Sequence, residues 1–234
     1  MKCDEGEGSV KPSFLRVSPF IVVCEGFHDV SFVCNLLRHL GITNCDVTFP
    51  KKTDGGNGKD RIVNVLRGLA SRKTGLEGVM VLWDADINPA TSFSDAQAAF
   101  TFPNTPFTPP PNPFMIHNGT IKTAVFLTPG TGRTGTLEHL MLDAARNHNP
   151  VLAACVEDLC QCTGLDQRNM SDNDKAKARL AAMIATSCDE PICSLAWIWN
   201  KVGNPIPINS PVFQELSDFL RLFTENPQMR IPNP

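Results

Sequence analysis

The sequence predicts an α/β fold, with a mostly parallel sheet of about four or five strands flanked by helices and a helical C-terminal part. Three observations support this prediction. Short apolar runs rich in β-branched residues alternate with segments of helical periodicity. The run at residues 79–83 is continuously apolar, which is typical of a central strand covered on both faces. Beyond residue 150 the patterns are mainly helical.

The expected elements are justified by apolar period, by capping residues and by glycine or proline at their ends. We expect strands at residues 19–24, 47–49, 79–83 and 120–127. We expect helices at residues 29–40, 60–71, 94–100, 136–147, 151–162, 174–187, 194–201 and 212–223. Trp197 and Trp199 are assigned to the core.

The chain divides into three predicted parts. Residues 1–18 form an N-terminal extension, residues 19–150 the α/β core, and residues 151–234 a helical region packed on that core. Inside the core, residues 101–118 are expected to form an extended surface loop because they hold six prolines.

Composition limits the class of protein. Hydrophobic residues make up 42% of the 234 residues and charged residues 19%, which is an ordinary globular composition. No apolar run is long enough to cross a membrane, and residues 1–18 lack the pattern of a signal peptide. We therefore expect a soluble cytoplasmic protein. The nine cysteines contain no C-x-x-C pair, so we expect small buried thiols in a reducing compartment.

The net charge of −3 excludes a basic nucleic-acid coat protein. If the protein binds nucleic acid, the positive field must come from a local patch, a bound metal or a partner.

Acidic side chains follow two predicted strands and begin one predicted helix. Glu25 ends the first strand, Asp84 and Asp86 end the third, and Glu138 lies in the first turn of the helix after residue 135. Functional groups of parallel sheets gather where strands end at the carboxyl edge. Carboxylates held close together repel one another, and a cation such as Mg²⁺ or Mn²⁺ removes the repulsion. The pattern therefore indicates a metal site formed by these four acids.

A simpler interpretation stays open for each acid. Glu25 and Asp29 are also suited to cap a helix, because acids favour helix N-termini. Asp84 and Asp86 are also suited to a turn before Pro89.

Two segments resemble the motifs of the Toprim family. Residues 22–30, with Glu25-Gly26 after a strand and an acid soon after, are similar to its first motif, and residues 81–86 to its D-x-D motif. A group of small bacterial Toprim-like proteins, related to the OLD-type nucleases, is closer still. Its proline-rich segment and its strand leading to a Pro-x-x-x-x-x-Gly-x-Leu-Glu loop correspond to residues 101–114 and 124–140 here, and the tail with Lys175, Lys177 and the two tryptophans also matches. The resemblance spans residues 18–223.

The resemblance implies a Rossmann-like sheet and a magnesium-dependent phosphodiester active site. Glu25 would be the general base or a metal-linked acid, Asp84 and Asp86 would hold Mg²⁺, and Glu138 would match the extra acid of OLD-like members, which use two metals. The chain contains no tyrosine, which excludes strand passage through a tyrosyl link. It shows no ATPase, helicase or zinc module, so a protein partner would supply an ATPase or DNA-binding function.

Two glycine-rich loops are candidate phosphate contacts. Lys59 follows the first of them, but Thr53 and Asp60 break the P-loop pattern there. Gly130–Gly135 matches G-x-G-x-x-G, with Gly132 and Arg133 placed to bind a phosphate beside Glu138. Lys175 is a further candidate because a helix N-terminus disfavours cations unless an anion lies nearby.

Three functions follow from these observations. The first is metal-dependent phosphodiester chemistry on nucleic acid or nucleotide, carried out by a nuclease or phosphotransferase. The second is a non-catalytic module that binds nucleotide or nucleic acid, or regulates a partner. The third is a dinucleotide-binding protein that uses Gly130–Gly135.

Overall fold

The computed structural model describes residues 18–50, 58–71 and 75–225, with residues 58–60 described in the backbone only. Within these residues five strands form one sheet in the order β2-β1-β3-β5-β4. Four strands are parallel, and the short edge strand β4 pairs antiparallel with β5. The strands are β1 (Phe20–Val23), β2 (Cys45–Thr48), β3 (Gly78–Asp84), β4 (Ile116–His117) and β5 (Lys122–Thr128). The predicted α/β class is confirmed.

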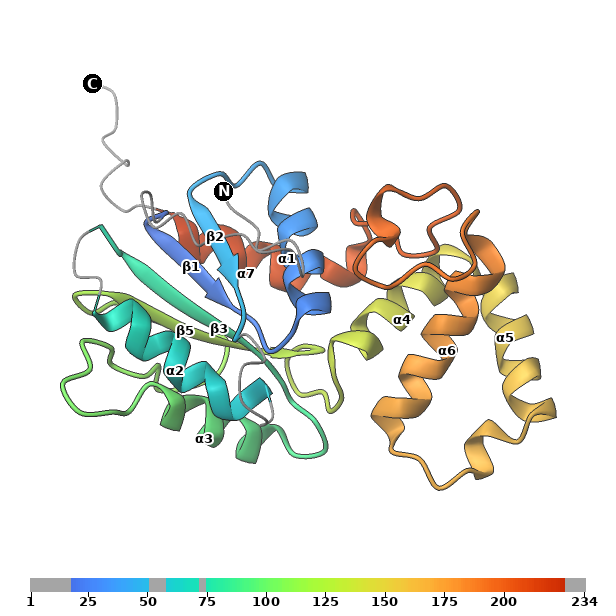
Figure 1. Ribbon diagram of the computed structural model, residues 1–234, viewed down its shortest axis with the longest axis horizontal. Helices are drawn as coiled ribbons and strands as arrows, with labels where there is room; N and C mark the ends of the chain where they lie inside the picture. The colour runs from blue at the N-terminus through green and yellow to red at the C-terminus, as the bar shows by residue number, and fades with distance from the viewer. Residues whose placement is uncertain (1–17, 51–57, 72–74, 226–234) are drawn as a thin grey trace.

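Helices cover both faces of the sheet (Figure 1). The helices α1 (Phe27–His39) and α7 (Gln214–Thr224) lie on one face, and α2 (Gly58–Ala70) and α3 (Pro89–Ala99) on the other. Along each strand, successive side chains point to opposite faces of the sheet, so neighbouring residues pack against different helices. Val22, Met80 and Phe126 pack with α1 and α7, whereas Val23, Val81 and Leu127 pack with α2 and α3.

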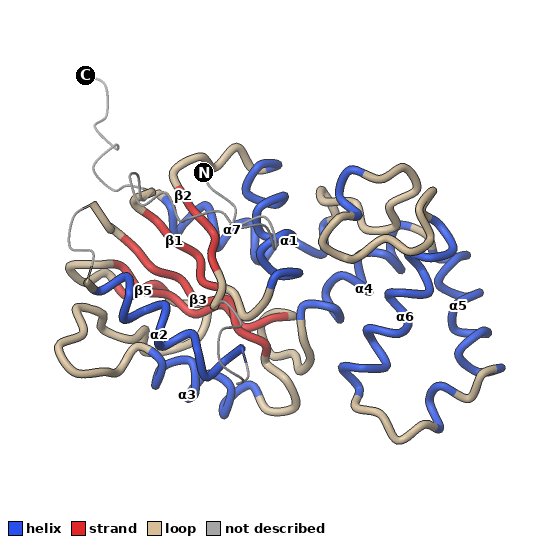
Figure 2. The backbone as a smooth tube through the Cα atoms, in the orientation of Figure 1, coloured by secondary structure: helices blue, strands red, loops and turns tan. Residues whose placement is uncertain are grey.

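Three further helices form a lobe beside the carboxyl edge of the sheet (Figure 2). They are α4 (Leu137–His148), α5 (Pro150–Cys162) and α6 (Asp172–Ser187). Arg179 of α6 links the segments of the lobe by ion pairs. Its guanidinium lies 3.0 Å from the Glu157 carboxylate and 2.6 Å from that of Asp166. In the described parts of the chain, no helix combines the length and the hydropathy that a membrane crossing requires.

The helix predicted at residues 194–201 is wrong. Only a 3-10 turn at Ile198–Asn200 forms there, within a segment of loops at residues 188–210. The Ala196 carbonyl accepts a hydrogen bond from the Ser31 hydroxyl of α1, so a tertiary contact uses it in place of an amide of a continuing helix. The prediction that Trp197 belongs to the core is also wrong, because 54% of Trp197 is exposed.

The start of α3 was predicted five residues too late. The helix begins at Pro89, because the Asn88 side chain accepts hydrogen bonds from the Ala90 and Thr91 amides. Asparagine before a first-turn proline is a strong helix start, and it outweighs the low apolar content of this turn.

The cysteines follow the prediction in part. Cys24, Cys45, Cys160 and Cys188 are buried free thiols. Cys155 and Cys162 are exposed, which the pattern of apolar stretches did not indicate. Cys34 is disulfide-bonded, so the expectation that every cysteine is reduced does not describe this structure.

Candidate active site

Glu25 and Asp84 meet because their strands are parallel neighbours. In the register of β1 and β3, Val23 lies opposite Val81, so both chains leave the sheet at the same edge. Glu25 follows β1 within two residues, and Asp84 is the last residue of β3. The backbone amide of Asp84 donates a hydrogen bond of 3.2 Å to Glu25 Oε1. The predicted convergence of these two acids is therefore present.

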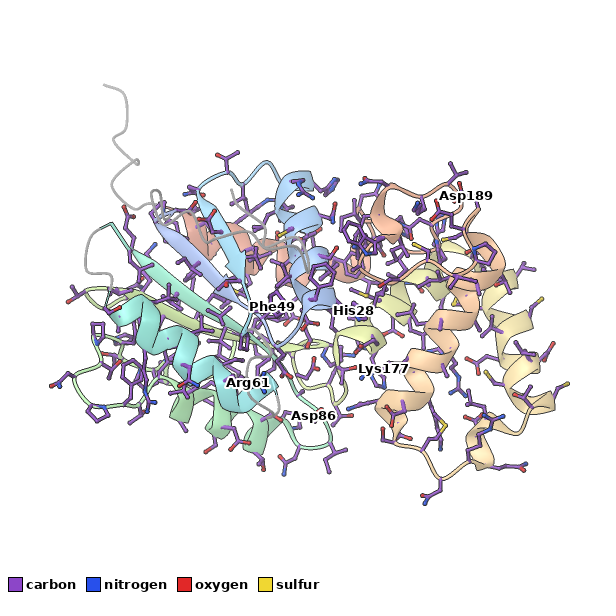
Figure 3. The ribbon with its side chains drawn as sticks, in the orientation of Figure 1. His28, Phe49, Arg61, Asp86, Lys177 and Asp189 are labelled. Atoms are coloured by element: carbon purple, nitrogen blue, oxygen red, sulfur yellow. The ribbon has the colours of Figure 1, made fainter. Side chains whose placement is uncertain are left out.

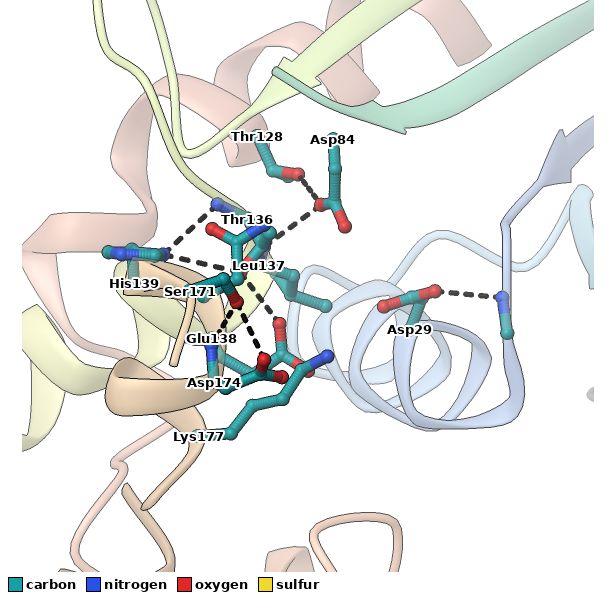
Figure 4. Close-up of polar contacts among 12 residues, drawn as sticks. Asp29, Asp84, Thr128, Thr136, Leu137, Glu138, His139, Ser171, Asp174 and Lys177 are labelled. Carbon is teal, nitrogen blue, oxygen red and sulfur yellow. Dashed lines mark hydrogen bonds and ion pairs between the residues drawn. The ribbon is translucent and has the colours of Figure 1, made fainter. Parts of the chain in front are cut away.

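The Asp84 carboxylate is held by two donors from the next strand and helix (Figure 4). Its Oδ1 accepts a 2.6 Å hydrogen bond from Thr128 Oγ1 at the end of β5 and a 3.0 Å hydrogen bond from the Leu137 amide. Leu137 is the first residue of α4, so Asp84 lies at the positive end of that helix. These contacts fix the orientation of the carboxylate.

Asp29 of α1 also lies at this edge of the sheet. Its Oδ2 accepts a 2.8 Å hydrogen bond from the Gly26 amide, so the helix-capping interpretation is confirmed for this residue. Figure 4 shows Asp29, Asp84 and Glu138 around a common space between α1 and α4. The sequence correctly predicted that Asp29 caps a helix, but Asp29 was not predicted to lie near the other acids. We call Glu25, Asp29, Asp84 and Glu138 the acidic cluster.

The charges of the acidic cluster act on one another. Burial raises the pKa of Asp84 to about 7, together with the charges of Glu25 and Glu138, against the lowering effect of the hydrogen bonds from Thr128 and Leu137. Burial also raises the pKa of Asp29 well above its ordinary value, with Asp84, Glu25 and Glu138 adding to it. The pKa of the buried Cys24 thiol rises mainly through burial, and the charges of Asp29, Glu25 and Asp84 raise it further. Perturbed carboxyl groups in one place are typical of functional sites.

Lys177 and His28 border the cluster on the side of the helical lobe. Lys177 of α6 has its Nζ 3.9 Å from Glu138 Oε1, and Glu138 is held by a 2.8 Å hydrogen bond from Thr136 Oγ1. Burial of its ring lowers the pKa of His28. The charge of Glu138 raises this pKa, and the charge of Lys177 lowers it. Figure 3 shows His28 and Lys177 where the sheet meets the lobe. Glu138 thus joins the site, as predicted.

Asp86 lies outside the cluster. Its backbone forms a two-bond bridge with Gly135, and its carboxylate accepts a 3.1 Å hydrogen bond from Asn173 of α6. The backbone of Asp86 has a φ of 51°, so the chain turns there and the two aspartates of the D-x-D motif contact different elements. A shared ion was predicted for both, and the structure does not bring them together.

The predicted phosphate contacts are distributed over three segments, the start of α2, the loop at residues 130–135 and α6. Lys59 belongs to the first turn of α2, and its side chain lies outside the described residues. Arg133 pairs with Asp143, and Lys175 donates to the Asp166 carbonyl at 3.1 Å. In the loop that carries Gly132, the neighbouring Thr131 amide donates to a carboxylate, that of Glu215 in α7. Arg133 and Lys175 therefore contact the helical lobe, and the loop that carries Gly132 contacts α7.

The G-x-G-x-x-G segment at Gly130–Gly135 is not followed by the strand that a dinucleotide-binding site requires, among the residues described after β5. A strand that ends in an acid should follow the glycine loop and its helix. Among the described residues after β5, only helices and turns occur. Gly130–Gly135 thus stands after the last strand of the sheet.

The acidic cluster suits a hard divalent cation by its donor chemistry. In the described part of the chain, no three His, Cys, Asp or Glu side chains are close enough to hold one metal ion as they stand. Mg²⁺ does not need such a complete set, because it keeps several waters and usually binds through one or two carboxylates plus substrate phosphate. Burial and mutual repulsion raise the pKa of Asp84 and of Asp29, and the positive charge of such a cation would offset both effects.

We expect Thr128→Val to raise the pKa of Asp84 above about 7, because valine keeps the shape but removes a hydrogen bond that lowers this pKa. Carbonyl-labelled aspartate followed by NMR over a pH series measures the change. Thr123→Val is the matched control, since Thr123 is a buried threonine of the same strand whose hydroxyl donates to the Thr108 carbonyl. An unchanged Asp84 titration in the Thr128 variant would contradict the site described here.

Fold and site together define a class: an α/β protein with a mostly parallel sheet and a buried acidic cluster at its carboxyl edge. The family model described as "Protein of unknown function (DUF3226)" matches residues 19–225, so the chain belongs to that family. Comparison with curated proteins and with solved structures found no match.

Proposed function

We propose that this protein carries out Mg²⁺- or Mn²⁺-dependent phosphodiester chemistry on nucleic acid or a nucleotide, as a nuclease-like member of the Toprim class. The observation that carries the proposal is the acidic cluster, in which burial, together with the charges of Glu25 and Glu138, raises the pKa of Asp84 to about 7. Structural carboxylates normally have partners that lower the pKa. A cluster that raises it is suited to a cation and a substrate phosphate.

The residues divide the work as follows. One or two of Glu25, Asp84 and Glu138 would hold the cation together with waters and a substrate phosphate, and the cation would stabilise negative charge on the phosphodiester oxygens. Thr128 and the α4 amide of Leu137 orient the Asp84 carboxylate. His28 and Lys177 are placed to contact a phosphate next to Glu138.

A non-catalytic module is the second candidate. The Lys177 ammonium lies 3.9 Å from Glu138 Oε1, so a side chain already offsets part of the negative charge. In such a module the same surface binds a nucleotide or nucleic acid without turnover, and a protein partner supplies the ATPase or DNA-binding function.

Asp84→Asn tests the proposal, because asparagine keeps an acceptor for Thr128 and Leu137 but removes the charge. Calorimetric titration with Mn²⁺ and Mg²⁺ should show binding to the wild type and little binding to the variant. In cleavage assays on single- and double-stranded DNA and RNA and on nucleotides, the variant should lose at least about 100-fold in rate.

Asp95→Asn is the matched control, since Asp95 is an exposed aspartate of α3 away from the cluster. It should bind metal and cleave like the wild type. Equal metal binding and cleavage by Asp84→Asn would refute the catalytic proposal. Metal binding by the wild type without turnover of any substrate would support the non-catalytic module.

A further inference from the structure

Three aromatic rings from different parts of the chain lie in a row beside the acidic cluster. Phe27 is the first residue of α1, Phe49 follows β2, and Trp197 belongs to the segment 188–210. The Phe27 ring centroid lies 6.1 Å from that of Phe49 and 6.1 Å from that of Trp197. We call these three rings the aromatic platform.

The platform is open to solvent at Trp197. This side chain is 54% exposed, whereas Trp83 is 3% exposed and buried under α2 and α3. Phe27 and Phe49 are partly buried. A large exposed aromatic ring that already packs on another ring indicates a surface prepared to bind a further flat group.

The platform adjoins the acidic cluster. Phe27 lies two residues after Glu25, and the intervening turn begins α1. The neighbouring His28 has its Nε2 3.5 Å from Ser194 Oγ, in the segment that carries Trp197, and its pKa responds to the charges of Glu138 and Lys177. In Figure 3 Phe49 and His28 lie at the same edge of the sheet as Lys177. A ligand on the platform therefore reaches toward the carboxylates.

A small cavity deepens the platform between α1 and residues 196–200. Its volume is about 100 Å³, and the rings of Phe27, Trp197 and Trp199 line it. Hydrogen-bonding groups of Asn35 and Asn200 line it as well. This volume is well below the roughly 300–1,000 Å³ of pockets that enclose a whole small-molecule ligand. The cavity suits one ring at the surface with polar groups at its edge.

We propose that the aromatic platform stacks an unpaired nucleobase of a single-stranded nucleic acid and so leads the strand to the acidic cluster. The inference rests on the proposed function for the chemistry that follows. Bases stack on aromatic side chains irrespective of sequence, and only unpaired bases expose their faces. The side-chain amide of Asn200, which lines the cavity, is placed to contact the edge of such a base.

The test measures binding in EDTA, so that cleavage plays no part. Single-stranded homo-oligonucleotides of DNA and RNA should quench the fluorescence of the exposed Trp197, while duplexes of the same length should not. In anisotropy titrations with a labelled single strand, Trp197→Ala should weaken binding about tenfold, an effect of the size expected for one base–aromatic stack. Phe27→Leu should weaken it in the same direction.

Ile192→Ala is the matched control, because Ile192 is fully exposed on the same segment and lies outside the platform. It should bind like the wild type, and circular dichroism should show that all variants are folded. Equal binding of single strand and duplex, or unchanged affinity in Trp197→Ala, would overturn the inference. If residues 188–210 bind a protein partner instead, the affinity for single strands should be unchanged in Trp197→Ala.

The two proposals fail separately. Strand binding in EDTA with no cleavage after Mg²⁺ is added would overturn the proposed function and support the platform. Cleavage with an unchanged KM in Trp197→Ala would overturn the platform and support the proposed function.

Discussion

Asp84→Asn is expected to make the metal-free protein more stable at pH 8, although it removes activity. In the wild type, burial disfavours the charged Asp84 carboxylate, and the charges of Glu25 and Glu138 add repulsion, so asparagine removes both penalties. The variant keeps an oxygen for the Thr128 hydroxyl and the Leu137 amide. The free energy of unfolding should rise by about 2–4 kcal/mol, since each pH unit of a pKa shift corresponds to about 1.4 kcal/mol. Stabilisation on loss of a functional charge is typical of active sites.

The gain in stability of Asp84→Asn over the wild type should increase as the pH rises. Below about pH 4 Asp84 is protonated in both the folded and the unfolded chain, so wild type and variant should be equally stable. Between pH 4 and 7 the unfolded chain releases this proton while the folded protein keeps it, because the folded pKa is about 7. Wild-type stability therefore falls as the pH rises through this window, and above it the difference from the variant should be constant.

Urea denaturation at pH 4, 6 and 8 in EDTA measures this difference. Asp95→Asn on the exposed face of α3 is the control, and it should show no such pH-dependent gain. Mg²⁺ should then stabilise the wild type and not the Asp84 variant, because a ligand stabilises only the state that binds it. Equal stability of wild type and Asp84→Asn at pH 8 would contradict a repulsive acidic cluster.

Gly203→Ala is expected to have the largest destabilising effect outside the site. Gly203 has a φ of +75°, and a Cβ at this position would lie 2.0 Å from the carbonyl oxygen of Ser187. That oxygen belongs to the backbone at the end of α6, so no side-chain rotation relieves the overlap. The combined backbone strain and displacement should lower the free energy of unfolding by about 3 kcal/mol, and the melting temperature by roughly 6–10 °C.

Gly68→Ala provides the opposite result as a control. Gly68 lies inside α2, and a Cβ there meets no atom within 4 Å. Alanine is favoured over glycine in a helix, so this variant should gain about 0.5–1 kcal/mol. If calorimetric melting shows Gly203→Ala as stable as the wild type, the packing of residues 188–210 on α6 is not as described. If it is destabilised, oligonucleotide affinity at the aromatic platform should fall with it.

The sheet and three acids of the acidic cluster, Glu25, Asp84 and Glu138, were predictable because they depend on local pattern and on the rule that functional groups gather at the carboxyl edge of a parallel sheet. Apolar runs located four of the five strands within a few residues, and β4 was missed because two residues leave no periodic signal. Parallel strands end at one edge, so Glu25 and Asp84 were predicted to approach each other without knowledge of the contacts between them.

The remaining features depend on contacts between distant segments. Whether Asp86 joins Asp84 is decided by the turn at φ 51° and by Asn173 of α6, which lies 87 residues away. Asp29 joins the cluster through the packing of α1 against the sheet. Trp197 is exposed because Ser31 binds the Ala196 carbonyl and no helix forms. None of these contacts leaves a periodic pattern in the sequence.

By itself, the sequence determined the α/β class, the parallel order of the main strands and the approach of Glu25 and Asp84, because periodicity and strand direction are local properties of the chain. Only the tertiary structure decided which acids share a site, the return of α7 to the sheet beside α1, and the row of aromatic rings. Those features arise where segments far apart in the chain pack together, and the direction of a side chain beyond the end of a strand is set by that packing.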